Sequence, residues 1–273
     1  YGKVYISIKA KSGSNLTVAT KESIVTSLKK YAVASVTPVI IDPETTYITV
    51  VVNFKYNSGI TTKDVTTLQT NVLSKIATYN NDTLEDFTGM FRYSKLIEAV
   101  NDADTSILSN ITTVKMYKYI TPTLSSSTKY DVYFRNAVYN PHSGHEAVLS
   151  STGFKISGNA NEMFLDDDGI GNVRCYYLVS GIKTVENATQ GTIDYATGQI
   201  TLNSLDVNTI SNIRGSASTV IEVSASPSSN DIVPVRDQIV EIDIANSNIT
   251  VTADTFVGGS ADAGVGYTTT SSY

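Results

Sequence analysis

Residues 47–56, Tyr47-Ile-Thr-Val-Val-Val-Asn-Phe-Lys-Tyr56, carry the strongest structural signal in the chain. Side chains of a β-strand alternate between two faces, so Ile48, Val50, Val52 and Phe54 share one face of an extended backbone. β-branched and aromatic residues also favour this conformation. The pattern predicts a strand with one apolar face, which elements on either side must cover.

Helices are predicted on both sides of this strand. Residues 21–33 carry apolar side chains at helical spacing, and Thr20 is the expected N-cap. Residues 65–79 repeat the same spacing after a polar start that ends at Asp64. A third, shorter helix is expected just after Ser94, which we interpret as its cap.

Two further strands complete the first part of the chain. Residues 4–10 alternate apolar and polar side chains, and residues 111–120 do the same. The predicted order is therefore strand, helix, strand, helix, helix, strand. A small mixed sheet with helices on one face would bury all the apolar stripes together, so we expect an α+β domain over residues 1–122.

The pattern changes after Pro122. Residues 123–129 form a polar, low-complexity link, and no helical period longer than about two turns follows them. Gly198 marks the turn of a predicted hairpin. We expect an all-β, sandwich-like domain over residues 130–257 and a Gly/Ser/Thr-rich tail over residues 258–273. The predicted strands cover residues 130–134, 148–157, 173–179, 192–195, 199–202, 219–225, 239–245 and 249–253.

Composition excludes several classes of protein. The 273 residues include 20 basic and 26 acidic side chains, a net charge of −6, and no run approaches the roughly 18 apolar residues of a membrane span. Residues 1–124 carry +3 (13 basic, 10 acidic) and residues 125–273 carry −9 (7 basic, 16 acidic). This balance argues against a nucleic-acid-binding surface, which needs clustered Lys and Arg. The chain begins without an initiator Met, so we expect a fragment of a longer protein.

The best metal candidate is the loop containing His142, His145 and Glu146. A zincin site needs two histidines one helical turn apart with the glutamate between them. Here Pro141 and Gly144 oppose a helix, and the glutamate lies outside the histidine pair. A polar loop is the favoured interpretation.

A calcium site is the corresponding hypothesis for Asp166, Asp167 and Asp168. In an EF-hand pattern starting at Asp166, the fifth and twelfth positions would be Ile170 and Tyr177, so two oxygen ligands are missing. An acidic turn between strands is favoured.

Other chemical signatures are weak or missing from the sequence. Glu85 and Asp86 could form a glycosidase pair, but nothing in the sequence fixes their separation. Cys175 is the only cysteine and lies in an alternating strand pattern, where we expect a small core residue. Nucleophile-elbow, phosphate-loop and dinucleotide-binding patterns do not occur. The sequence therefore predicts no catalytic residue, no metal ligand and no cofactor.

Several phrases in residues 1–120 resemble a known family. They are a helix ending in Leu28-Lys-Lys-Tyr31, the run Val36-Thr-Pro-Val-Ile-Ile-Asp-Pro43 leading into the strand at residues 47–56, the stretch from Phe91 to Val100, and the closing strand from Ile111. Together they resemble the C-terminal portion of the baseplate J-like family of contractile-tail phages, most closely its T-even branch. The β-rich remainder is similar to an additional C-terminal domain of that branch.

The resemblance implies a structural role without active-site residues. It implies a virion protein of the tail baseplate, assembled in the host cytoplasm, which forms a homodimer and also pairs with other baseplate wedge proteins, without nucleic-acid or membrane partners. Such pairs would connect adjacent wedges into a ring around the hub, and the ring would persist during the change that triggers sheath contraction. Two alternatives remain open. One is a Ser/Thr-rich bacterial surface or adhesin-like binding module, and the other is a carbohydrate-active enzyme that uses the acidic turns.

Overall fold

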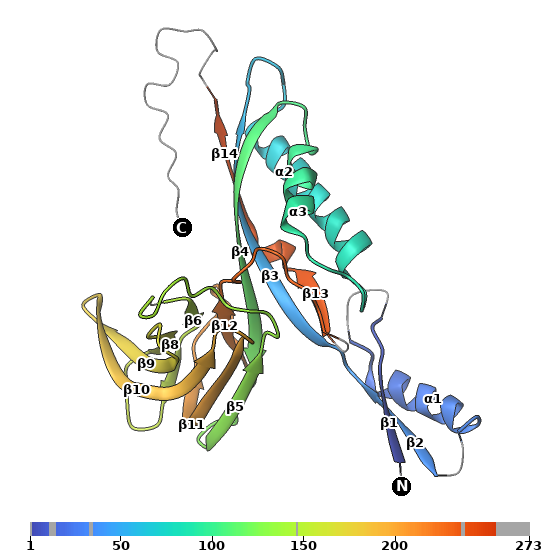
Figure 1. Ribbon diagram of the computed structural model, residues 1–273, viewed down its shortest axis with the longest axis vertical. Helices are drawn as coiled ribbons and strands as arrows, with labels where there is room; N and C mark the ends of the chain where they lie inside the picture. Colours follow the sequence, from blue (N-terminus) through green and yellow to red (C-terminus); the bar gives the residue numbers. More distant parts are fainter. Residues whose placement is uncertain (1, 11–14, 33–34, 146, 236–237, 255–273) are drawn as a thin grey trace.

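Two long antiparallel strands, β3 (Glu44–Tyr56) and β4 (Ile107–Ile120), form the axis of the protein in the computed structural model (Figure 1). The structure describes residues 2–10, 15–32, 35–145, 147–235 and 238–254. Ile48, Val50, Val52 and Phe54 are at most 1% exposed, which confirms the predicted buried face of the strand.

Helices α2 (Val65–Tyr79) and α3 (Tyr93–Asn101) lie side by side along one face of these strands, joined by the short helix η1 (Asn80–Leu84) (Figure 1). Asp64 caps α2 by accepting from Thr67 N at 2.7 Å. The prediction that Ser94 caps α3 is wrong, because Ser94 lies inside that helix. Asp231 Oδ1, from a distant segment, accepts from Tyr93 N at 2.9 Å instead.

The first strand and helix do not join this sheet. β1 (Gly2–Ser7) and β2 (Val36–Ile41) form a separate two-stranded parallel sheet beside α1 (Val18–Lys29). We call residues 2–41 the arm, and it projects from the N-terminal end of β3 (Figure 1). The expectation of one sheet burying every stripe is therefore wrong here. The helix also begins earlier than predicted, because Thr17 is its cap and Thr20 N is the donor, at 3.2 Å.

Strands from the end of the chain complete the sheet around β3. β13 (Gln238–Ile242) and β14 (Asn248–Ala253), linked by the turn η2 (Ile244–Asn246), both pair with β3 in parallel. Both strands were predicted, but within the second β-rich region. The sheet around β3 is thus built from segments at opposite ends of the chain.

The second half closes into a small barrel. β7 (Phe154–Ile156), β8 (Met163–Asp167), β9 (Asn172–Val179), β10 (Ile182–Asp194) and β11 (Gln199–Ile210) pair in succession, and β7 also pairs with β11. The sandwich-like expectation is therefore replaced by barrel-like closure, and β8 is a strand that the sequence patterns missed. The predicted hairpin at Gly198 is confirmed, with Asp194 opposite Gln199.

Three short strands connect the barrel to the central sheet. β5 (Ser127–Tyr133) pairs with β11 and begins inside the predicted polar link. β12 (Ile221–Ala225) lies between β4 and β6 (Leu149–Ser151). The sheet therefore continues from β4 into the second half of the chain.

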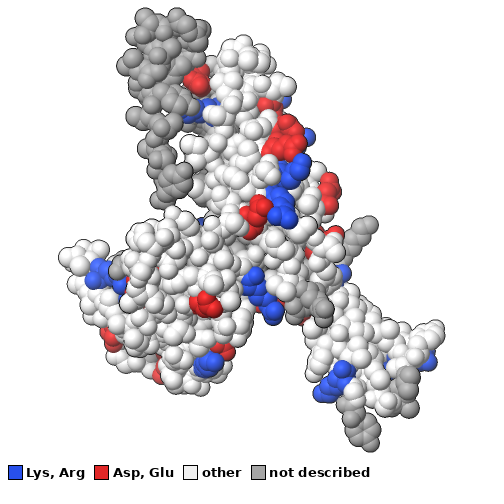
Figure 2. All heavy atoms as spheres, viewed as in Figure 1, with Lys and Arg blue, Asp and Glu red and all other residues white. Residues whose placement is uncertain are grey.

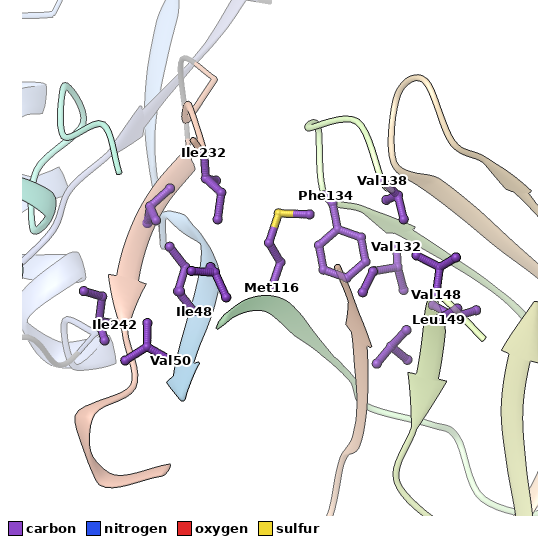
Figure 3. Close-up of a cluster of buried hydrophobic side chains, with 14 of the residues drawn as sticks. Ile48, Val50, Met116, Val132, Phe134, Val138, Val148, Leu149, Ile232 and Ile242 are labelled. Carbon is purple, nitrogen blue, oxygen red and sulfur yellow. The ribbon is translucent and has the colours of Figure 1, made fainter. Parts of the chain in front are cut away.

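The buried apolar side chains follow the same path. One contiguous cluster runs from Ile48 and Met116 to Phe134 and Leu149, all less than 1% exposed (Figure 3). This continuity fixes the position of the barrel relative to β3 and β4. The division of the chain near residues 123–129 stays a prediction, and the predicted tail at residues 258–273 lies outside the described residues.

Candidate functional site

The structure brings together the two loops that the sequence singled out. Gly144 N donates to Gly169 O at 3.0 Å, so the histidine loop rests on the acidic turn. Gly169 has φ +74°, and an added Cβ would lie 2.3 Å from His145 N. Only glycine fits this contact. Glu146, the third member of the predicted histidine group, lies outside the described residues.

Asp166 is held by two cations. It lies on β8 opposite Arg174 of β9 and is 2% exposed. Arg174 donates to both carboxylate oxygens, from Nε at 3.0 Å and from Nη2 at 2.8 Å, and the Lys183 ammonium forms a further ion pair with Asp166 Oδ2. A buried carboxylate needs such partners to remain charged. The charge of Asp166 is thus already balanced within the protein.

Asp167 joins three segments and is completely buried. Its Oδ1 accepts from Val148 N and Leu149 N, both at 2.8 Å, and its Oδ2 accepts from Tyr195 Oη at 2.8 Å. Burial first, and then the hydrogen bond to Asp167, raise the pKa of Tyr195. Asp167 therefore fixes the loop before β6 against the barrel.

Asp168 closes its own turn. It accepts from Ile170 N at 3.0 Å, from Asn172 N at 2.9 Å and from Asn172 Nδ2 at 2.6 Å. Burial opposes ionisation here, but the hydrogen bonds from Asn172 and Ile170 outweigh it, so the pKa of Asp168 is lowered. The three aspartates thus face different partners, and in the described part of the chain no three His, Cys, Asp or Glu side chains converge as metal ligands.

The remaining sequence candidates do not converge on one point. The rings of His142 and His145 meet edge to face with centroids 5.1 Å apart. Glu85 accepts from Asn80 Nδ2 at 2.9 Å, while Asp86 accepts from Thr88, whose hydrogen bonds lower the pKa of Asp86. Cys175 is 1% exposed, and burial raises the pKa of its thiol to about 12. This arrangement favours structural roles over catalysis.

Sequence reasoning did not locate the surfaces on which apolar side chains are exposed. One lies on the face of β3 and β4 opposite α2 and α3, where Val51 is 38% and Ile111 is 51% exposed. Another is the tip of the β9–β10 hairpin, where Ile182 is 71% exposed. Large exposed apolar side chains are frequent at protein–protein contacts. Once a strand is assigned, the alternation of its side chains identifies the residues on the face opposite the core. It does not show whether that face is exposed.

A group of tyrosines lies on the other face of the β3–β4 pair from the helices. The rings of Tyr47 and Tyr117 stack with centroids 5.1 Å apart, and Tyr119 packs edge to face on Tyr117 at 5.3 Å. Tyr117 Oη donates to Asp243 Oδ2 at 2.5 Å, and burial, followed by this bond, raises the pKa of Tyr117. Tyr119 remains 42% exposed, so this group combines a rigid base with an accessible ring.

Charged side chains are sparse on the face shown in Figure 2, where most of the surface belongs to uncharged residues. Within the described residues, no helix is long and apolar enough to cross a membrane.

Comparisons with known proteins agree with the sequence phrases. Residues 1–41 match the family model described as baseplate structural protein gp6, C-terminal domain I, and residues 44–119 match the model for C-terminal domain III. The chain is also 27% identical over 212 residues to the baseplate wedge protein gp6 of Enterobacteria phage T4. This alignment covers 74% of the present chain. The chain spans about 30% of the length of that relative. The first match coincides with the arm and the second with β3 to β4.

Proposed function

We propose that this chain is a structural component of a phage tail baseplate, where it pairs with a second copy of itself and connects adjacent wedges into a ring around the hub. The observation that carries the proposal is the similarity to the C-terminal part of gp6, through two family models that follow one another along the chain. The proposed location is the baseplate of the virion.

The architecture supports an assembly role. A single apolar core joins the central sheet to the barrel, and such continuity lets a protein transmit force without bending between its parts. The ion pair between Asp166 and Arg174 joins the neighbouring barrel strands β8 and β9. Exposed apolar side chains on the sheet face and on the β9–β10 tip are available for neighbours. No catalytic role is proposed, and Asp166, Asp167 and Cys175 are buried in the fold.

The pairing is tested by sedimentation equilibrium of the purified chain between about 1 and 100 µM, a range that covers typical assembly contacts. We expect a reversible dimer. A strict monomer over the whole range would contradict self-pairing. The location is tested by cryo-electron microscopy of the virion of the source phage, in which density for the β3–β4 sheet and the barrel is expected in a ring at the baseplate.

A further inference from the structure

We propose that the arm docks on the acidic region, residues 125–254, of a second copy of this chain, with each copy giving its arm to the other. The proposal rests on the self-pairing stated above and assigns the surfaces that make the pair. It follows from the incomplete burial of the arm, its charge and the charge of the remainder of the chain.

The arm does not have a core of its own. All residues of α1 are described and none is buried, and the strands of the arm contribute Pro38 alone to the buried set of the described chain. Apolar side chains are strongly exposed instead: Tyr5 by 61%, Val18 by 71% and Tyr31 by 88%. Parallel sheets are normally covered on both faces, and a two-stranded sheet is marginal in water. The residues that the structure describes therefore leave much of the arm uncovered.

A hollow on the arm has the form of a docking site. It has a volume of about 460 Å³ and lies between α1 and β2. Val25, Pro38 and Ile40 contribute apolar lining, Lys29 contributes an ammonium group, and Glu22 and Lys21, which is paired with Asp42, also line the hollow. An apolar hollow lined in part by lysines suits a surface that presents apolar and acidic side chains together.

The arm and the remainder of the chain carry opposite net charges. Residues 1–41 contain six lysines and one glutamate, a net charge of +5, so the other residues carry 14 basic and 25 acidic side chains, or −11. Lys21 pairs with Asp42 at 2.6 Å, and Lys9 pairs with Glu85 at 3.3 Å. Lys3, Lys29 and Lys30 form no ion pair with any residue that the structure describes. Lysines on the arm are visible at its surface in Figure 2.

The opposite net charges determine which part of a second copy the arm is proposed to contact. Pairing arm against arm would bring two surfaces of +5 together, and like charges oppose association. Residues 125–254 contain 7 basic and 15 acidic side chains, a net charge of −8, and offer the opposite charge. In a two-fold pair, a contact between arm and acidic region occurs twice, because each copy contributes both surfaces. In such a pair, the arm of each copy is therefore covered by the acidic region of the other copy.

The test combines charge reversal with mapping of the contact. The double variant Lys29→Glu/Lys30→Glu changes the end of α1, and Lys3→Glu changes β1 independently of the helix. Each is expected to weaken the dimer at least about tenfold, because several ionic contacts are reversed. The control Lys75→Glu/Lys95→Glu makes a double reversal at exposed lysines of α2 and α3, outside the arm and away from the exposed sheet face, and should pair as the wild type does. Circular dichroism shows whether the arm variants keep their helix.

Zero-length carbodiimide coupling then joins lysines to carboxylates in an equal mixture of unlabelled and ¹⁵N-labelled chain. Mixed-isotope products should link Lys3, Lys29 or Lys30 to carboxylates within residues 125–254. Raising the salt from about 50 to about 500 mM should weaken the dimer, because surface charges are then screened. A dimer that is unaffected by the arm variants, or whose coupled products exclude the arm, would overturn this inference and leave self-pairing intact. A chain that is monomeric throughout would overturn both.

Discussion

Asp167 shows how one buried side chain can organise several segments. Its carboxylate is the acceptor for Val148 N, Leu149 N and Tyr195 Oη. We expect Asp167→Ala to lower the free energy of unfolding by about 2–4 kcal/mol, because two buried backbone amides lose their acceptor. Urea unfolding measures this loss. Tyr195→Phe is the matched control and should cost about 1 kcal/mol, since it removes one hydrogen bond; equal losses would contradict the role of the amides.

Asp104 gives a pH dependence with a defined sign. Hydrogen bonds from Lys63 and Ser106 lower the pKa of its carboxyl to about 2. A lowered folded-state pKa stabilises the protein above the unfolded pKa of about 4, and this contribution disappears as the pH falls through about 2. The stability difference between wild type and Asp104→Asn should therefore be largest above pH 4 and should shrink towards pH 2. Urea unfolding across this range checks it.

The control for Asp104 is Asp82→Asn, at an exposed carboxylate. It removes one negative charge outside the contact of Asp104 with Lys63 and Ser106, and so measures the effect of the charge change alone. A difference for Asp104→Asn that grows on acidification would reverse the sign and contradict the assignment. The partner Lys63 does not follow from sequence, because it lies 41 positions from Asp104 and reaches it only in the folded chain.

At the level of the elements, the β10–β11 turn depends on glycine for two reasons. Gly198 has φ +67°, and an added Cβ would lie 2.3 Å from Asn136 O. Gly181, in the β9–β10 turn, has φ +82°, but an added Cβ would meet nothing within 4 Å. Gly181→Ala should cost about 1–2 kcal/mol for its backbone conformation, and Gly198→Ala clearly more because of the added clash. Thermal unfolding compares them, and equal costs would contradict the steric argument.

Elements with a strong period were predictable, but their partners were not. The alternation in residues 47–56 and the helical spacing in residues 65–79 gave β3 and α2 nearly in full. Alternation does not show which strand lies alongside. Gln238 and Thr46, 192 positions apart, are joined by a 2.9 Å hydrogen bond, and no local signal announces that contact. Likewise, the cap of α3 comes from Asp231, and β8 does not alternate, because three apolar residues are followed by two aspartates.

At the candidate sites too, the segments could be identified from the sequence, but the partners of their side chains could not. The sequence correctly identified the segments rich in carboxylates and histidines, and structure placed the two loops in contact. It could not show that Arg174 and Lys183 neutralise Asp166, since those partners belong to the next strands of the barrel. The alternation in residues 4–10 correctly indicated a strand, but burial along it is incomplete, because Val4 is 48% exposed whereas Ile6 is partly buried.

At the scale of the whole molecule, stability should be uneven. The arm contains one buried residue in its helix and strands, whereas β3 and β4 belong to the continuous core. Amide exchange should therefore be fastest in the arm and slowest in β3 and β4, because local opening is easiest where few apolar side chains are buried. Hydrogen-exchange mass spectrometry at low protein concentration measures this. Equal protection of arm and core would contradict it.

The parallel strands β13 and β14 have a consequence for synthesis of the protein. One edge of β3 is filled by residues 238–253, and Asp254 N still donates to Tyr56 O at 2.8 Å. During translation, this edge of β3 remains unpaired until almost all of the described residues have emerged from the ribosome. Until then β3 offers unpaired backbone groups to other nascent chains. Copies translated close together on one messenger RNA are therefore exposed to mispairing at this edge, and a chain that stops before residue 238 keeps it open permanently.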